Sequence, residues 1–88
     1  MNGDGTSTGS AGGRPPADPE VLDCRGQRCP LPVISLAQRL PQVRVGAVLR
    51  VLADDPAAGN DIVAWCRLRE QEFAGSPARD TYDVRRTH

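Results

Sequence analysis

The chain has no lysine. Its eleven basic residues are all arginine, and eleven acidic residues balance them to a formal net charge of zero. A dedicated nucleic-acid-binding domain is usually strongly basic, so we expect no direct nucleic-acid partner. Long apolar runs are absent as well, since no segment approaches the ~20 apolar residues that a membrane span needs. The N-terminus also lacks the basic and apolar regions of a secretory signal. These absences predict a cytoplasmic protein without a membrane partner.

The length of 88 residues limits the chain to one small domain. Residues 1–19 are rich in Gly, Ser, Thr, Ala, Pro and Asp and hold no large aliphatic side chain after Met1. Such a segment cannot bury enough apolar surface to offset its ordering entropy, so we predict a disordered tail there. The folded domain should span residues 20–88. A domain of this size cannot wall a deep pocket, which favours a reactive group presented at the surface.

Cysteine occurs three times, as Cys24, Cys29 and Cys66. An odd number in an unsecreted chain does not indicate a disulfide framework. The spacing contains no Cys-x-x-Cys pair, so we expect no metal site. The one histidine is His88, at the last position, which leaves a cysteine-protease mechanism without a general base. Cys66 lies among the apolar residues of a predicted helix and is expected to fill the core.

Two segments have the sequence features of helices. Residues 30–40 carry apolar side chains at i, i+3, i+4 and i+7, the spacing of one helical face. Pro41 should end or kink this helix because it lacks a backbone donor. Asp54 and Asp55 followed by Pro56 predict the start of a second helix, with an acidic cap and a proline at the first helical position.

Four further segments have the length and apolar content of strands. They are residues 20–24, 47–53, 71–74 and 81–85, and a Gly-Ser-Pro turn separates the last two. Together with the helices, the second of which should end at about residue 69, they give the order β-α-β-α-β-β. This order predicts an α+β fold, a two-layer sandwich in which two helices cover one face of a four-stranded mixed sheet.

Cys29 occupies the position of a helix cap, directly before Pro30 at the first helical position. Cysteine is an unusual cap, since Ser, Thr, Asp and Asn are preferred there, and such departures tend to mark functional sites. The N-terminus of a helix carries roughly half a positive charge, which favours thiolate over thiol. Arg25 and Arg28 could strengthen that field. The sequence therefore predicts a nucleophilic Cys29 with a lowered pKa.

The two prolines after Cys29 bear on how its sulfur is presented. Pro32 falls at the third helical position and, like Pro30, has no backbone N–H. Of the first three helical amides, only that of Leu31 is left to face the Cys29 sulfur. We therefore expect the prolines to stiffen the start of the helix and to direct the sulfur outward, more than to solvate a thiolate.

The residues around Cys29 form a Cys-Pro-x-Pro motif that follows a first strand and Gly26. Further downstream come Gly46, the segment Ala-Asp-Asp-Pro-Ala at residues 53–57, and the pairs Asp61-Ile62 and Trp65-Cys66. In these motifs, which extend over nearly all of residues 20–88, the chain resembles the TusA/SirA family of sulfur carriers.

The resemblance implies a carrier that accepts sulfur from a cysteine desulfurase or another donor protein, holds it as a persulfide on Cys29 and passes it to an acceptor protein. Such a protein is a co-substrate of a sulfur relay more than a turnover enzyme. Destinations in the family include wobble-uridine thiolation in tRNA, molybdenum-cofactor supply, sulfur oxidation and selenium metabolism. Pro30 and Pro32 would shape the loop around the sulfur, and no bound metal or organic cofactor is implied.

Cys24 departs from the family motif and leaves other functions open. As a resolving thiol it would attack the Cys29 persulfide, which requires the two Cα atoms to lie within ~7 Å, and the protein would be a thiol redox or sensor module. Otherwise Cys24 is a strand-end residue without chemistry. A third possibility is a non-catalytic regulatory partner of an enzyme, for which Cys29 would be dispensable. Asp54, Asp55 and Asp61 are expected to cap the second helix, with contact to a partner as the alternative.

Overall fold

The structure is a computed structural model that describes residues 19–88, so the tail predicted at residues 1–19 lies outside the described residues apart from Pro19. The elements follow in the order β2 (Glu20–Asp23), α1 (Leu31–Arg39), the 3-10 helix η1 (Leu40–Gln42), β3 (Val48–Leu52), α2 (Ala58–Arg69), β4 (Glu72–Ala78) and β5 (Thr81–Arg85). The predicted order β-α-β-α-β-β is therefore confirmed.

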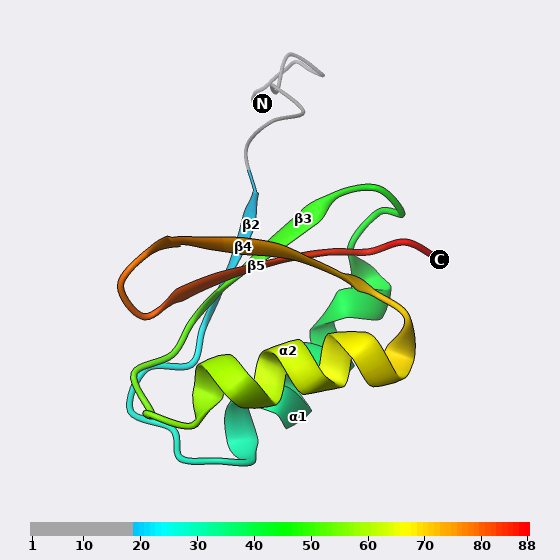
Figure 1. Ribbon diagram of the computed structural model, residues 1–88. Coiled ribbons are helices and arrows are strands. Elements are labelled where there is room, and N and C mark those ends of the chain that lie inside the picture. The colour runs from blue at the N-terminus through cyan, green and yellow to red at the C-terminus, as the bar shows by residue number, and fades with distance from the viewer. Residues whose placement is uncertain (1–18) are drawn as a thin grey trace, which may run out of the picture.

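The four strands form one mixed sheet in the order β2-β3-β5-β4. β2 pairs with β3 in parallel, and β5 pairs antiparallel with both β3 and β4. Both helices lie against the same face of this sheet (Figure 1). The predicted two-layer α+β sandwich is confirmed, and its one parallel pair has a consequence for the site. Because parallel strands end at the same edge of a sheet, the loops that follow β2 and β3 are neighbours.

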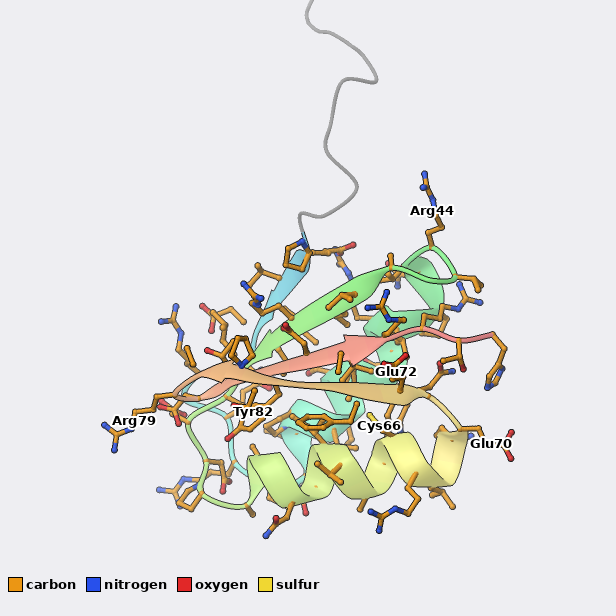
Figure 2. All side chains as sticks on the ribbon, turned by 45° about the horizontal axis from the view of Figure 1, so that its top comes forward. Arg44, Cys66, Glu70, Glu72, Arg79 and Tyr82 are labelled. Atoms are coloured by element: carbon orange, nitrogen blue, oxygen red, sulfur yellow. The ribbon has the colours of Figure 1, made fainter. Side chains whose placement is uncertain are left out.

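The core lies between the helices and the sheet. Buried and partly exposed residues alternate along β3, which is the pattern of a strand with one packed face and one solvated face. Leu49 and Val51 of β3 and Leu36 of α1 are fully buried, as is Ile62 of α2. Burying a side chain of this size contributes ~1.5–3 kcal/mol, so these contacts hold the helices in place. Figure 2 shows Cys66 of α2 in the same layer, below the sheet.

The first helix ends as its proline predicts. α1 stops at Arg39, and the chain continues as the 3-10 helix η1, which contains Pro41. Leu40 donates its backbone N–H to the Leu36 carbonyl and caps α1. Pro41 has no N–H with which to extend that pattern, so the prediction that it ends the helix is confirmed.

The second helix starts later than predicted. Its first residue is Ala58, two positions after Pro56, and it runs to Arg69. The Asp55 side chain accepts a hydrogen bond from the Ala57 backbone N–H at 2.8 Å, and the Asp55 carbonyl accepts one from the Ala58 N–H at 2.9 Å. Asp55 thus closes a turn before the helix, and the prediction of Pro56 at the first helical position is wrong.

The hairpin of β4 and β5 also differs from expectation. The Gly-Ser-Pro segment predicted to be a turn belongs to β4, which continues to Ala78, and the chain reverses at Arg79 and Asp80. Asp80 has a positive φ of 55°, as a tight hairpin turn requires. β4 is an edge strand with two irregularities in its pairing, so it tolerates Pro77, which cannot donate to a ladder.

No helix within residues 19–88 has the length and the apolar character that crossing a membrane would require.

Candidate functional site

Cys29 lies in the loop that joins β2 to α1, and its side chain is exposed. The loop leaves the sheet at Cys24, whose backbone N–H donates to the Leu52 carbonyl at 2.7 Å. It then turns at Gly26, which has a φ of +86°. Only glycine adopts this conformation without strain, which is a physical reason for Gly26 at this place. The sequence-predicted residues Gly26 and Cys29 are thus parts of one loop at the edge of the sheet.

Two neighbouring carboxylates hold this loop from across the sheet edge. Asp54 accepts a hydrogen bond from the Gly26 backbone N–H at 2.9 Å, and Asp55 accepts one from the Cys29 backbone N–H at 2.6 Å. Both belong to the segment between β3 and α2, which runs beside the β2–α1 loop (Figure 1). The cap residue of α2 is Ala57, and no side chain caps the helix, so the capping role predicted for Asp54 and Asp55 is wrong. The hydrogen bonds of Asp54 and Asp55 to the Cys29 loop were not predicted.

A third carboxylate contacts the sulfur itself. The Cys29 thiol donates a hydrogen bond to Oδ2 of Asp61 at 2.8 Å. Asp61 lies in the first turn of α2, and its backbone N–H donates to the Ala57 carbonyl. Cys29 therefore turns toward the start of α2, although it lies only two residues before α1 in the sequence.

The pKa of the Cys29 thiol is raised above its usual value, and the predicted lowering is wrong. The main cause is the hydrogen bond from the thiol to Asp61, which stabilises the protonated form. Partial removal from water adds to the rise, as do the negative charges of Asp61 and Asp55. The surroundings of Cys29 therefore favour the neutral thiol over the thiolate.

The start of α1 explains why the helix does not activate the sulfur. α1 begins at Leu31, so Pro30 is the cap residue and Pro32 stands at the second helical position, one place earlier than predicted. The Leu31 N–H, expected to face the sulfur, donates instead to the Arg28 carbonyl at 2.8 Å. Of the first two helical positions, one N–H is bonded elsewhere and the other does not exist, and the Cys29 sulfur faces carboxylates.

The two arginines predicted to strengthen the field have other contacts. Arg25 forms a two-pronged ion pair with Asp23, at 2.9 and 2.7 Å, and this pair lowers the pKa of Asp23 to about 2. Arg28 is exposed, and its charge helps the backbone N–H groups of Ala57 and Cys29 to lower the pKa of Asp55. Neither arginine forms an ion pair with Asp55 or Asp61, and the net effect of the surroundings is still to raise the pKa of the Cys29 thiol.

The other two cysteines are buried free thiols. Cys66 is 2% exposed, and burial raises its pKa to about 11, so its predicted place in the core is confirmed. Cys24 is 1% exposed and packs in the same core cluster. Burial raises the pKa of Cys24, against a smaller opposing effect of a hydrogen bond with Ser35. Of the three thiols, Cys29 is the one that a partner protein can reach.

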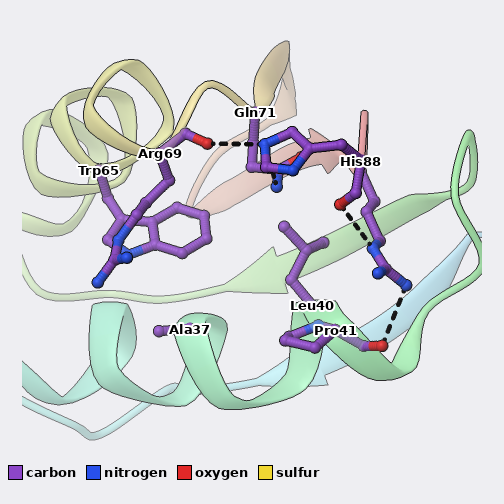
Figure 3. Close-up of a pocket in the computed structure, with 8 residues that line it drawn as sticks. Ala37, Leu40, Pro41, Trp65, Arg69, Gln71 and His88 are labelled. Carbon is purple, nitrogen blue, oxygen red and sulfur yellow. Dashed lines mark hydrogen bonds between the residues drawn. The ribbon is translucent and has the colours of Figure 1, made fainter.

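A groove of about 320 Å³ lies elsewhere, where the C-terminal parts of α1 and α2 meet the end of the chain. Ala37 and Leu40 line it on one side and His88 on the opposite side, with Trp65 and Arg69 next to each other between them (Figure 3). His88, to which the sequence assigned no role, contacts the Arg69 carbonyl at 3.1 Å. The groove contains no cysteine and is separate from the site around Cys29. Nowhere in residues 19–88 do three Cys, His, Asp or Glu side chains gather as metal ligands would.

Sequence reasoning missed that Asp54, Asp55 and Asp61 act on the Cys29 loop. Their position at the start of a helix had a simpler explanation as capping. A usable signal was present in the parallel pairing of the first two strands, which brings the loops after both strands to one edge of the sheet. A tertiary arrangement of this kind cannot be read from spacing along one segment.

Comparison with known proteins relates the chain to one family. The family model described as sulfurtransferase TusA matches residues 20–84. The sulfur carrier protein TusA of Buchnera aphidicola subsp. Baizongia pistaciae (strain Bp) is 30% identical over 74 residues, which cover 81% of this chain and 94% of that protein. A Bacillus subtilis (strain 168) protein named "Putative sulfur carrier protein YrkF" is 33% identical over 58 residues, or 66% of this chain. That alignment covers 31% of the longer Bacillus protein.

Proposed function

The chain belongs to the TusA sulfurtransferase family of sulfur carriers, and from this premise we propose that it carries sulfane sulfur as a persulfide on Cys29. The observation that carries the proposal is the contrast among the three thiols. Cys29 is exposed on a loop held by hydrogen bonds to Asp54, Asp55 and Asp61, whereas the other two cysteines are buried. A carrier needs one accessible sulfur in a fixed position, and Cys29 meets that need.

The proposed transfer is a thiol–persulfide exchange. Cys29 loses its proton, and the thiolate attacks the outer sulfur of a donor persulfide. A sulfur–sulfur bond to Cys29 forms as the bond between the two donor sulfurs breaks, and the leaving donor thiolate takes up a proton. The net reaction converts Cys29 thiol and donor persulfide into Cys29 persulfide and donor thiol. No external oxidant or reductant is consumed, and delivery to an acceptor thiol repeats the exchange in the opposite sense.

Donor and acceptor are expected to be proteins that dock around Cys29. The sulfur lies on the surface, so recognition has to come from the loop and from the helix beside it. Leu31 and Ile34, on the first turn of α1, are large apolar residues left 48% and 44% exposed close to Cys29 in the sequence. We propose a cysteine desulfurase as donor and a further relay protein as acceptor, in the reducing cytoplasm where thiols stay free.

The final destination of the sulfur is a proposal of the same kind. Thiolation of the wobble uridine in tRNA, cofactor sulfuration and sulfur oxidation each draw on such carriers, and the acceptor decides among them. Gly26, Pro30 and Pro32 would shape the loop for any of these acceptors. The resolving role considered for Cys24 has less support, because this thiol is 1% exposed and its pKa is raised by burial.

Intact-mass spectrometry after incubation with a cysteine desulfurase and cysteine tests the proposal. Wild type, Cys24→Ser and Cys66→Ser should each gain one sulfur atom, which a reductant removes, and Cys29→Ser should gain none. If Cys29→Ser still gained a sulfur atom, Cys29 would not be the carrier residue. Loading lost in Cys24→Ser, together with a Cys24–Cys29 disulfide in wild type under mild oxidation, would favour the redox module instead.

A further inference from the structure

The Asp61 carboxylate differs from the other two carboxylates of the site in what it binds. Asp54 and Asp55 accept hydrogen bonds from backbone N–H groups of the Cys29 loop. Asp61 accepts one from the reacting sulfur at 2.8 Å, and within residues 19–88 no other hydrogen bond or ion pair reaches its carboxylate. Its residue is partly exposed, so a docked protein can approach it.

A carboxylate oxygen at this distance from the sulfur requires a proton between them. Ionised Asp61 is acceptor-only, and a Cys29 thiolate would place a second negative charge at hydrogen-bonding distance from it. Asp55, whose own oxygens are bonded to the Ala57 and Cys29 N–H groups, adds a further negative charge nearby. Among the cations close in sequence, Arg25 is paired with Asp23, and Arg28 is exposed next to Cys29 without a hydrogen bond to either carboxylate.

We propose that Asp61 is a positioning residue that keeps the Cys29 thiol protonated and oriented in the free carrier until a cationic side chain of a docked sulfur donor engages its carboxylate. The proposal rests on the sulfur-carrier function and adds a selectivity to it. When an arginine or lysine of the donor pairs with Asp61, the thiol loses its acceptor and the repulsion that opposes a thiolate. The proton leaves to water or to the departing donor thiolate, and Asp61 itself is neither oxidised nor reduced.

The consequence is a preference for protein donors over small persulfides. A small molecule such as glutathione persulfide meets Cys29 as a neutral thiol, which is a poor nucleophile. A donor protein that brings its own cation meets a thiolate. Asp61 would thus slow the exchange of sulfur between small persulfides and Cys29. Transfer from a donor protein that supplies a cation would not be slowed.

Asp61→Asn is the variant that tests the proposal, because the amide keeps the size of the side chain and can still accept from the thiol but carries no charge. The rate of Cys29 alkylation by iodoacetamide is measured against pH, with the modified residue identified by peptide mass spectrometry. We expect the midpoint of the Asp61→Asn profile to move to lower pH and its rate at neutral pH to rise several-fold. Asp54→Asn is the matched control, since Asp54 contacts the same loop but not the sulfur, and its midpoint should stay with wild type.

The second measurement compares donors at neutral pH. Asp61→Asn should be loaded faster than wild type by glutathione persulfide, while loading by a cysteine desulfurase should not gain from the substitution. An unchanged alkylation midpoint in a folded Asp61→Asn protein would overturn the role of Asp61, as would an equal shift in Asp54→Asn. If Asp61→Asn were loaded faster than wild type to the same degree by glutathione persulfide and by the desulfurase, the proposal that a donor cation releases the Cys29 thiol from Asp61 would be overturned. Failure of wild type to accept sulfur from any donor would refute the carrier function instead, and the alkylation midpoints would still decide whether Asp61 holds the proton.

Discussion

The Cys29 thiol donates a hydrogen bond of 2.8 Å to the carboxylate of Asp61, a residue 32 positions later in the chain. The contact exists because β2 and β3 run in parallel and deliver their following loops to the same edge of the sheet. It also reverses the electrostatics that the Cys-Pro start of α1 predicts, because the sulfur faces a carboxylate and not a row of free amides. The exposed Cys29 sulfur therefore lies beside a carboxylate that favours the thiol over the thiolate.

Asp55 should make the protein sensitive to acid. Hydrogen bonds from the backbone N–H groups of Ala57 and Cys29 lower the pKa of Asp55 in the folded state. Its contribution to stability is therefore fully present above the ordinary carboxyl pKa of ~3.9 and is lost as the pH falls through the lowered native value. The free energy of unfolding of wild type, measured by urea denaturation, should fall over this pH range. That of Asp55→Asn should fall less. The same dependence of unfolding free energy on pH in wild type and Asp55→Asn would contradict this role.

Gly26 and Gly46 form a matched pair for testing the loop. Their φ values are +86° and +91°, and an added Cβ would meet nothing within 4 Å at either place. Alanine at each position should cost about 1 kcal/mol from backbone strain alone. Gly26→Ala should also slow sulfur loading, because strain at residue 26 would shift the Cys29 loop and weaken the hydrogen bond from the residue 26 N–H to Asp54. Loading slowed as much by Gly46→Ala would show that the effect is one of general stability.

The buried cysteines should differ in how they tolerate serine. In Cys66→Ser a hydroxyl enters the core without a polar partner, which costs about 1–3 kcal/mol in the free energy of unfolding. Cys24→Ser should cost less, because the Ser35 side chain is within hydrogen-bonding reach of position 24. Urea denaturation measures both, and both variants should still load sulfur on Cys29. A larger loss for Cys24→Ser would contradict the assigned contact with Ser35.

Arg25 should have little influence on the sulfur. Its guanidinium is bound to Asp23 through two hydrogen bonds, so Arg25→Gln should leave the pH midpoint of Cys29 alkylation where wild type has it. The same experiment on Asp61→Asn provides the positive control for a shift. A clear rise of the midpoint in Arg25→Gln would restore the role that the sequence predicts for this arginine.

The sequence predicts the fold well because the fold depends on local patterns. The helical face of residues 30–40, the break at Pro41 and the strand at residues 47–53 are each specified by neighbouring residues, and the structure agrees to within a residue or two. The prediction fails for the Gly-Ser-Pro segment, where the edge position of β4 allows a strand that local composition opposes.

The site is predicted in part. Cys29 is identified by its motif, and the structure exposes it, but its chemical environment comes from residues on another loop. Helix-start electrostatics along residues 29–32 predicts a thiolate, whereas the observed acceptor belongs to α2. Because charges act through space, no inspection of the Cys-Pro-x-Pro segment alone could give the sign of the effect on the Cys29 pKa.

The most direct test of the central claim follows one sulfur atom through a single turnover. The protein is charged by a cysteine desulfurase with radiolabelled cysteine, separated from the donor and digested for peptide mapping, and a second portion is mixed with excess acceptor thiol. We predict that the label resides on the peptide containing Cys29 and leaves it for the acceptor thiol. Label on a peptide containing Cys24 or Cys66, or label that stays on the protein in the presence of acceptor, would contradict a relay through Cys29.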